Sequence, residues 1–182
     1  MNMNDVPVGE ERTGSKYITV DKGQTNYAVK VSKVENGINS KAGSPYIQIT
    51  VETEDAASAS NRYTFSGGAI IISNKALVSL VEAVNNLDGS KEQERNKAKS
   101  LIGEFSSYDE LAIKLSSLVV GKPIAMHFNG EWYNPEDTSK ESYLKAIFGY
   151  FAPIGRLSTL KNSLITKGIK ALSNHSPANT DV

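Results

Sequence analysis

The sequence contains no cysteine and only two histidines, His127 and His175, in 182 residues. Without cysteine it has no disulfide, no thiolate nucleophile and no cysteine-ligated zinc or iron–sulfur site. Two histidines are too few for a multi-histidine metal site, and no serine or acid motif accompanies His127. Gly67-Gly68 lacks the lysine of a phosphate-binding loop, so nucleotide hydrolysis has no support. We therefore expect a protein that is not an enzyme and that uses no metal or other cofactor.

An excess of charge of one sign and a long apolar run are also absent. Twenty basic residues balance twenty acidic ones, so binding to nucleic acid or to an anionic surface would depend on local patches. The longest apolar runs, residues 69–72 and 146–151, are far shorter than the roughly 20 residues of a membrane-spanning helix. Residues 1–15 are polar and show no signal peptide. The sequence therefore predicts a soluble protein with no membrane partner.

The sequence does contain alternating apolar and polar residues, which predict strands. The alternation predicts a first strand over residues 27–34 and a second, antiparallel to it, over residues 46–52. A third strand is expected from Arg62 to residue 72, bent at the two glycines within it. From Ser73 the apolar spacing changes to three and four residues, which indicates an amphipathic helix.

The second half of the chain predicts further helix and a hairpin. Residues 88–99 are charged and form either a solvated helix or a mobile excursion, and a capping box of Ser107 and Glu110 begins another helix. A strand over residues 123–128 is followed by Asn129-Gly130, the strongest hairpin signal in the sequence. The last strand is expected at residues 143–151.

This order of elements is typical of a mainly β fold with helices, of the α+β class. We expect a five-stranded Greek-key barrel of the OB type, with a helical insertion between the third and fourth strands and a C-terminal helix. An immunoglobulin-like sandwich and an open α+β sheet remain as alternatives. The expected divisions are a flexible N-terminus (1–15), the barrel domain (16–152) and a basic amphipathic segment with a disordered end (153–182).

Aromatic and cationic residues are interleaved on the predicted strands and their loops. Rings stack on bases and cations contact phosphates, which suits a protein that binds single strands without reading their sequence. Aromatic residues are also favoured in strands generally, and half of these are expected to face the core. The candidate nucleic-acid-binding residues are Lys30, Lys33, Lys41, Tyr46, Gln48, Arg62, Tyr63, Phe65, Trp132 and Tyr133.

Alternation predicts the direction of some of these side chains. Tyr46 and Gln48 alternate with the apolar residues of the second strand, so we expect them to face outward. Tyr63 and Phe65 share a face whose direction the sequence leaves open. Trp132, soon after the expected turn, is predicted to be partly exposed near the loop between the last strands.

Two short segments resemble bacteriophage single-stranded-DNA-binding proteins of the OB type. In that group a turn of small residues precedes the second strand, and a hydrophobic pair, Gly-Lys and a further hydrophobic residue open the fourth. The likeness covers roughly residues 17–151. The matching segments are Gly43-Ser44-Pro45-Tyr46-Ile47-Gln48-Ile49 and Leu118-Val119-Val120-Gly121-Lys122-Pro123-Ile124.

The resemblance implies a non-catalytic protein that coats and protects single-stranded DNA in phage replication or recombination. Its partner would be single-stranded DNA, or RNA, and it would act in the cytoplasm, that of the host if a phage encodes it. Many such proteins end in an acidic tail, whereas a basic segment precedes residues 179–182 here, and that segment could bind DNA or a second subunit of a homo-oligomer. The alternative is a β-domain that binds protein or glycan, such as a phage structural or adaptor protein.

Overall fold

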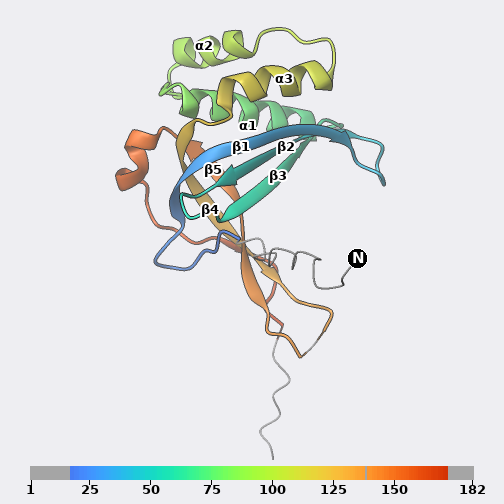
Figure 1. Cartoon of the computed structure of the whole chain (residues 1–182), viewed down its shortest axis with the longest axis vertical. Coiled ribbons are helices and arrows are strands. Elements are labelled where there is room, and N and C mark those ends of the chain that lie inside the picture. Colours follow the sequence, from blue (N-terminus) through green and yellow to red (C-terminus); the bar gives the residue numbers. More distant parts are fainter. Residues whose placement is uncertain (1–16, 138, 172–182) are drawn as a thin grey trace, which may run out of the picture.

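Figure 1 shows the computed structural model of the chain, which describes residues 17–137 and 139–171. The fold is mixed α+β, with an open sheet of six strands and the α-helices gathered at one end of it (Figure 1). The expected flexible N-terminus and disordered C-terminal end lie outside the described residues. The elements are β1 (Asn26–Ile38), β2 (Pro45–Glu52), β3 (Ser58–Thr64), α1 (Ala69–Val84), α2 (Glu92–Ile102), α3 (Tyr108–Val119), β4 (Pro123–Tyr133), β5 (Tyr143–Ala152), the 3-10 helix η2 (Ile154–Thr159) and β6 (Thr166–Lys167).

The long strand β1 holds the sheet together. The strand order is β3-β2-β1-β4-β5, all antiparallel, and β6 pairs in parallel with β4. The first residues of β1 pair with β4, from Asn26 opposite His127, and the rest pair with β2, ending at Ile38 opposite Pro45. The pairing with β2 begins at Lys30, where the pairing with β4 ends, and a bulge interrupts it between Val31 and Lys33. Because a bulge increases local bend and twist, one strand can serve two neighbours in a curved sheet.

The α+β class is confirmed, but the sheet does not close into the barrel that the sequence predicts. In the part of the chain that the structure describes, β3 and β5 end the strand order and do not pair with each other. Residues 17–20 cross the gap instead: Tyr17 forms a bridge with Ser58 of β3, and Thr19 forms one with Lys145 of β5. Ile18, which lies between the two bridged residues, and Val20, which follows the second, are buried in the core. A short extended segment therefore fills the opening that a fully paired barrel would not have.

The third strand is shorter than expected, and residues 69–72 begin α1 rather than continuing the strand. Gly67 has a φ of 50°, a left-handed conformation that glycine adopts without strain, and the chain turns there. Ser73, where the helix was expected to begin, lies inside α1, and its hydroxyl donates to the carbonyl of Thr64 at the end of β3 over 2.7 Å. Of the two alternatives for residues 88–99, helix is confirmed for the part that belongs to α2.

The predicted turn at Asn129-Gly130 is also wrong, because β4 runs through both residues to Tyr133. Gly130 pairs with Ala146 of β5, and a Cβ at position 130 would lie 2.8 Å from the side chain of Leu144. The glycine therefore allows close packing across the ladder rather than a reversal of the chain. The reversal comes after Tyr133, in the segment that leads to β5.

The predicted C-terminal helix is replaced by the six-residue 3-10 helix η2 and an extended segment. Asn162 ties this segment to the start of β1: its Oδ1 accepts from the backbone N–H and hydroxyl of Thr25 (3.4 and 3.2 Å) and from Nδ2 of Asn26 (3.0 Å). Leu164 packs against the core, and β6 follows along β4. Residues 160–167 are thus bound along one side of the sheet.

Replacing Asn162 by alanine is expected to lower the free energy of unfolding by about 1–3 kcal/mol, because the hydroxyl of fully buried Thr25 would lose its acceptor. Urea denaturation followed by circular dichroism measures the loss. Asn96→Ala, at an exposed position of α2, is the control and should change stability by less than about 0.5 kcal/mol. Equal stability of the two variants would contradict the anchoring role.

The core lies between the inner face of the sheet and the helices α1 and α3. Alternation along β2 buries Ile47, Ile49 and Val51, while three- and four-residue spacing buries the inner face of each helix. α2 contributes less, and only Ala98 and Ile102 of that helix are buried. In the described part of the chain, the helices therefore cover the inner face of the sheet, and none of them lies on the outer face of β1, β2 and β3.

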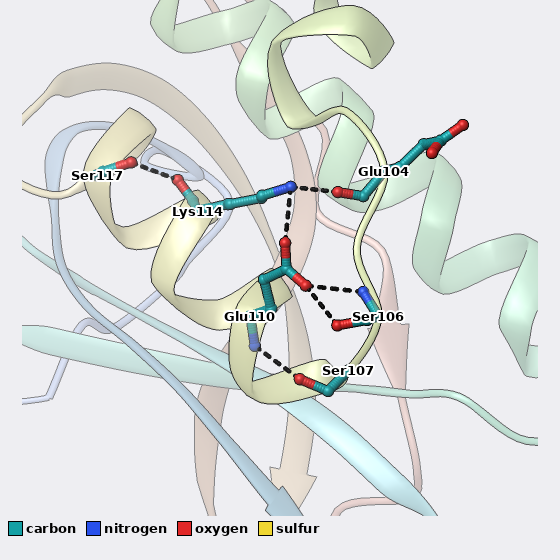
Figure 2. A network of polar contacts seen from close by, with 6 residues as sticks. All are labelled: Glu104, Ser106, Ser107, Glu110, Lys114 and Ser117. Atoms are coloured by element: carbon teal, nitrogen blue, oxygen red, sulfur yellow. Dashed lines mark hydrogen bonds and ion pairs between the residues drawn. The ribbon is translucent and has the colours of Figure 1, made fainter.

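The start of α3 is stabilised by a polar network (Figure 2). Ser107 caps the helix as predicted, since its hydroxyl accepts from the backbone N–H of Glu110 at 3.1 Å. The Glu110 carboxylate accepts from the backbone N–H and hydroxyl of Ser106 (2.8 and 2.7 Å), not from the cap residue. Lys114 lies 3.0 Å from the same carboxylate and donates to the carbonyl of Glu104. The network joins the α2–α3 loop to the first turn of α3.

This network predicts an acid-sensitive contribution to stability. The two bonds from Ser106, followed by the contact with Lys114, lower the pKa of Glu110 from its ordinary 4.5 to about 2. Because the folded-state pKa is the lower one, the stabilisation is full above pH 4.5 and is lost as the pH falls through about 2. We therefore expect the Tm difference between the natural protein and Glu110→Gln, measured by thermal melts from pH 7 to pH 2, to shrink toward zero at the acid end. A constant difference would contradict this.

Candidate nucleic-acid interface

The outer face of β1, β2 and β3, with the β1–β2 turn, carries six of the ten residues predicted from the sequence. Tyr46 and Gln48 point away from the core, as predicted, because they alternate with the buried Ile47 and Ile49. On β3, Arg62 lies directly opposite Gln48 in the antiparallel register, so its side chain emerges on the same face. The remaining members are Lys30, Lys33 and Lys41.

Arg62, Gln48 and Tyr46 form a contact cluster on this face. Nε of Arg62 donates to Oε1 of Gln48 over 2.8 Å, and the guanidinium carbon lies 4.5 Å from the centre of the Tyr46 ring. The Tyr46 ring packs against Gly37 of β1, where a Cβ would lie 2.5 Å from the tyrosine hydroxyl. The glycine on one side and the cation–π contact on the other hold the ring in a defined position. An exposed cation next to an oriented ring is an arrangement that can hold a phosphate and a base.

The three lysines are spread along β1 and the β1–β2 turn, from Lys30 opposite Glu52 to Lys41 in the turn, and acidic residues lie among them. Lys30 is opposite Glu52 in the β1–β2 register, and Nζ of Lys33 lies 2.7 Å from a carboxylate oxygen of Glu35. Lys41 is exposed in the β1–β2 turn, where its backbone N–H donates to Oδ1 of Asn39 at 3.0 Å. Nearby carboxylates therefore partly neutralise the cations of this face, and the face does not carry a continuous strip of positive charge.

Tyr63 and Phe65 lie on the opposite, inner side. Tyr63 is opposite Ile47 in the register, and burial raises its pKa to about 12. Phe65 is 5% exposed, and its ring centre lies 4.7 Å from that of Tyr108 on α3. Both rings contribute to the core, so neither is placed to stack on a base.

Trp132 and Tyr133 lie on the β4–β5 hairpin, which extends beyond β3 on the side away from the helices (Figure 1). Trp132 is half-buried, with Nζ of Lys170 5.3 Å from the centre of its ring. Tyr133 is exposed, and its ring centre lies 5.1 Å from that of Tyr143 on β5. The hairpin thus carries a second aromatic and cationic cluster.

Two members of this second cluster, Tyr143 and Lys170, were not predicted from the sequence. Tyr143 lies opposite Tyr133 in the β4–β5 register. The turn expected at Asn129-Gly130 implied a different pairing of residues between these strands, so it did not bring the two tyrosines together. Lys170 reaches Trp132 because β6 lies along β4, a pairing that has no local sequence signal.

His127, which the sequence left without a catalytic partner, is buried on β4. Its Nδ1 lies 2.7 Å from Oδ1 of Asn26, and its ring stacks on that of Tyr150 with centres 4.9 Å apart. These contacts give the imidazole a structural role at the junction of β1, β4 and β5. Among residues 17–137 and 139–171, no three histidine, aspartate or glutamate side chains gather as a metal ion would require.

No helix in the described residues is long and apolar enough to span a lipid bilayer. No protein-family model and no curated protein matches the chain. The case for the outer face therefore rests on this chain's own residues.

Proposed function

We propose that the protein binds single-stranded DNA without catalysing a reaction, and that it coats and protects such strands in phage replication or recombination. The observation that carries this proposal is the cluster of Tyr46, Gln48 and Arg62 on the uncovered face of β2 and β3. A ring held in place can stack on an unpaired base of any identity, and a cation next to it can contact the phosphate. A paired base offers no free face to such a ring. This function belongs in the cytoplasm, where replicating DNA is found.

The arrangement of strands supports an OB-type fold as part of the same proposal. The order β3-β2-β1-β4-β5, with the helices inserted between β3 and β4, is that of an OB fold opened between its third and fifth strands. OB folds bind oligonucleotides on strands 2 and 3 and on the loops that follow strands 1 and 4. Here those positions hold the Tyr46 cluster, Lys41 and the β4–β5 hairpin. The segment that resembles phage proteins, residues 43–49, contributes Tyr46 and Gln48.

Fluorescence anisotropy with a labelled oligothymidine tests the proposal. We expect single strands to bind more tightly than a duplex of the same length, and affinity to fall as salt rises. Each phosphate contact contributes a slope of roughly −0.7 in log affinity against log salt, so Lys30, Lys33, Lys41 and Arg62 together allow a slope of about −3. An oligouridine of the same length shows whether the sugar matters. Equal affinity for single strand and duplex, or no binding at low salt, would contradict the proposal.

The second candidate is a domain that binds protein or glycan through the same face. Glu35 and Glu52, which lie among the lysines, favour this alternative because carboxylates repel phosphates. Such binding need not release counterions. Absence of oligothymidine binding, together with salt-insensitive binding to a glycan or protein, would support it.

A further inference from the structure

A groove of about 1100 Å³ lies on a different part of the molecule. One wall is the face of α1 that carries Ile71, Lys75, Val78 and Glu82, which follow one another at helical spacing. The other walls are the α1–α2 loop and the chain from the end of β5 through η2. None of the ten predicted nucleic-acid-binding residues lines it, so the groove is separate from the outer face of β1, β2 and β3.

The groove combines an apolar surface with cations. Its apolar side chains are aliphatic for the most part and come from every wall. Its cations come from α1, α2, η2 and the segment after η2, so positive charge surrounds the apolar surface. The apolar members include Ile71, Val78 and Leu160, and the cations include Lys75, Arg156 and Lys161.

The two acidic residues of the groove already have partners within the protein. Glu82 is 8% exposed, and its carboxylate lies 3.7 Å from Nε of Arg95. Oδ1 of Asp88 accepts from the backbone N–H and hydroxyl of Ser90 (3.0 and 2.7 Å), and Oδ2 lies 3.7 Å from Nζ of Lys91. The groove therefore presents a positive field to a ligand, because both of its carboxylates are paired and four further cations line it. These cations are Lys75, Lys99, Arg156 and Lys161.

The shape and lining of the groove favour a peptide over a nucleic acid. The surface of aliphatic side chains accepts branched or aromatic side chains of a peptide, whereas single-strand binding needs flat rings for stacking. Both aromatic rings at the groove already contact other rings: Tyr150 stacks on His127 with one face, and Phe151 meets Phe148 edge to face. We propose that the groove binds an acidic segment of a partner protein, whose bulky apolar side chains contact the aliphatic surface and whose carboxylates contact the surrounding lysines and arginines.

The test measures binding of a defined probe to the full-length protein. The probe is a fluorescein-labelled peptide of twelve residues in which every third residue is leucine or phenylalanine and the others are aspartate. We expect saturable binding with a Kd below about 100 μM at low salt, weakened by salt. The same peptide with alanine in place of leucine and phenylalanine should bind at least about tenfold more weakly, because it cannot bury apolar surface.

Charge-reversal variants locate the binding site. Lys75→Glu combined with Lys161→Glu changes two exposed groove residues on opposite walls, and we expect about a tenfold loss of affinity for the peptide. Lys97→Glu combined with Lys122→Glu makes the same change in net charge at exposed positions outside the groove. This control should change the affinity less than about twofold. Thermal melts show whether both variants are folded.

Three results would overturn the proposal. One is absence of peptide binding up to about 1 mM, and another is an equal loss for the two double variants, which would indicate general charge attraction. The third is a loss of oligothymidine affinity in the Lys75→Glu and Lys161→Glu variant with peptide affinity unchanged, which would assign the groove to nucleic acid. Failure of the natural protein to bind oligothymidine would leave the groove proposal intact, because the two sites share no residue.

Discussion

Replacing Phe128 by alanine is expected to lower the free energy of unfolding by about 3–5 kcal/mol, the largest loss expected from any single change considered above. The ring is fully buried on β4, and it meets Tyr27 and Phe148 edge to face, with ring centres 5.8 Å away in each case. Phe148 in turn contacts Phe151, so the substitution would leave a cavity in a cluster of rings supplied by β1, β4 and β5. Strands on three sides limit how far this cavity can collapse.

Denaturant unfolding followed by tyrosine and tryptophan fluorescence measures this effect. Phe105→Ala is the matched control, since Phe105 is 39% exposed in the α2–α3 loop and its ring centre lies 6.3 Å from that of Tyr108. We expect the control to lose less than about 1 kcal/mol. A loss below about 1.5 kcal/mol at Phe128 would show that the three strands relax into the space.

Replacing Tyr46 by alanine is expected to weaken oligothymidine binding roughly 5- to 100-fold. Base stacking on an aromatic side chain contributes about 1–3 kcal/mol per base, and this ring is oriented by Arg62 and Gly37. Because the substitution removes no charge, the salt slope should stay the same. Arg62→Ala removes a cation, so it should lower affinity and also reduce the magnitude of the slope by about 0.7.

Anisotropy titrations at several salt concentrations separate these two effects. Phe105→Ala serves again as the control, because it removes a partly exposed aromatic ring that belongs to the α2–α3 loop and not to β1, β2 or β3. Its affinity for oligothymidine should match that of the natural protein. Unchanged affinity in Tyr46→Ala would move DNA binding away from this face and toward the hairpin cluster around Trp132 and Tyr133.

The elements that the sequence predicts correctly are those with one buried face. Along β2 a period of two separates the apolar residues from Tyr46 and Gln48, so both the strand and the direction of its side chains follow from the pattern. The helix α3 is predicted by its capping serine, Ser107, and by apolar residues at three- and four-residue spacing. In both cases the apolar pattern, and for α3 also the cap, lies within or next to the element itself, so the local sequence is enough to predict it.

The errors arise where distant residues decide the conformation. Asn129-Gly130 is a turn signal in isolation, but Gly130 is needed because Leu144 approaches it from the opposite strand. The direction of Tyr63 depends on its register with Ile47, which alternation within β3 alone does not show. In the candidate site, the outward direction of Tyr46 and Gln48 was therefore predicted correctly, whereas the third strand and the hairpin needed the structure.

The division of β1 between two partners has a consequence for the order in which the chain acquires its structure. β2 follows β1 after a short turn, but the residues of β4 that pair with Asn26 come about a hundred positions later. During synthesis the first half of β1 thus remains without a neighbouring strand until all three helices have been made. Closing so long a loop lowers the entropy of the chain before the contacts between β1 and β4 can stabilise it. Folding is therefore expected to be slow, in the millisecond-to-second range typical of β-rich topologies, with pairing of β1 and β4 as its late step.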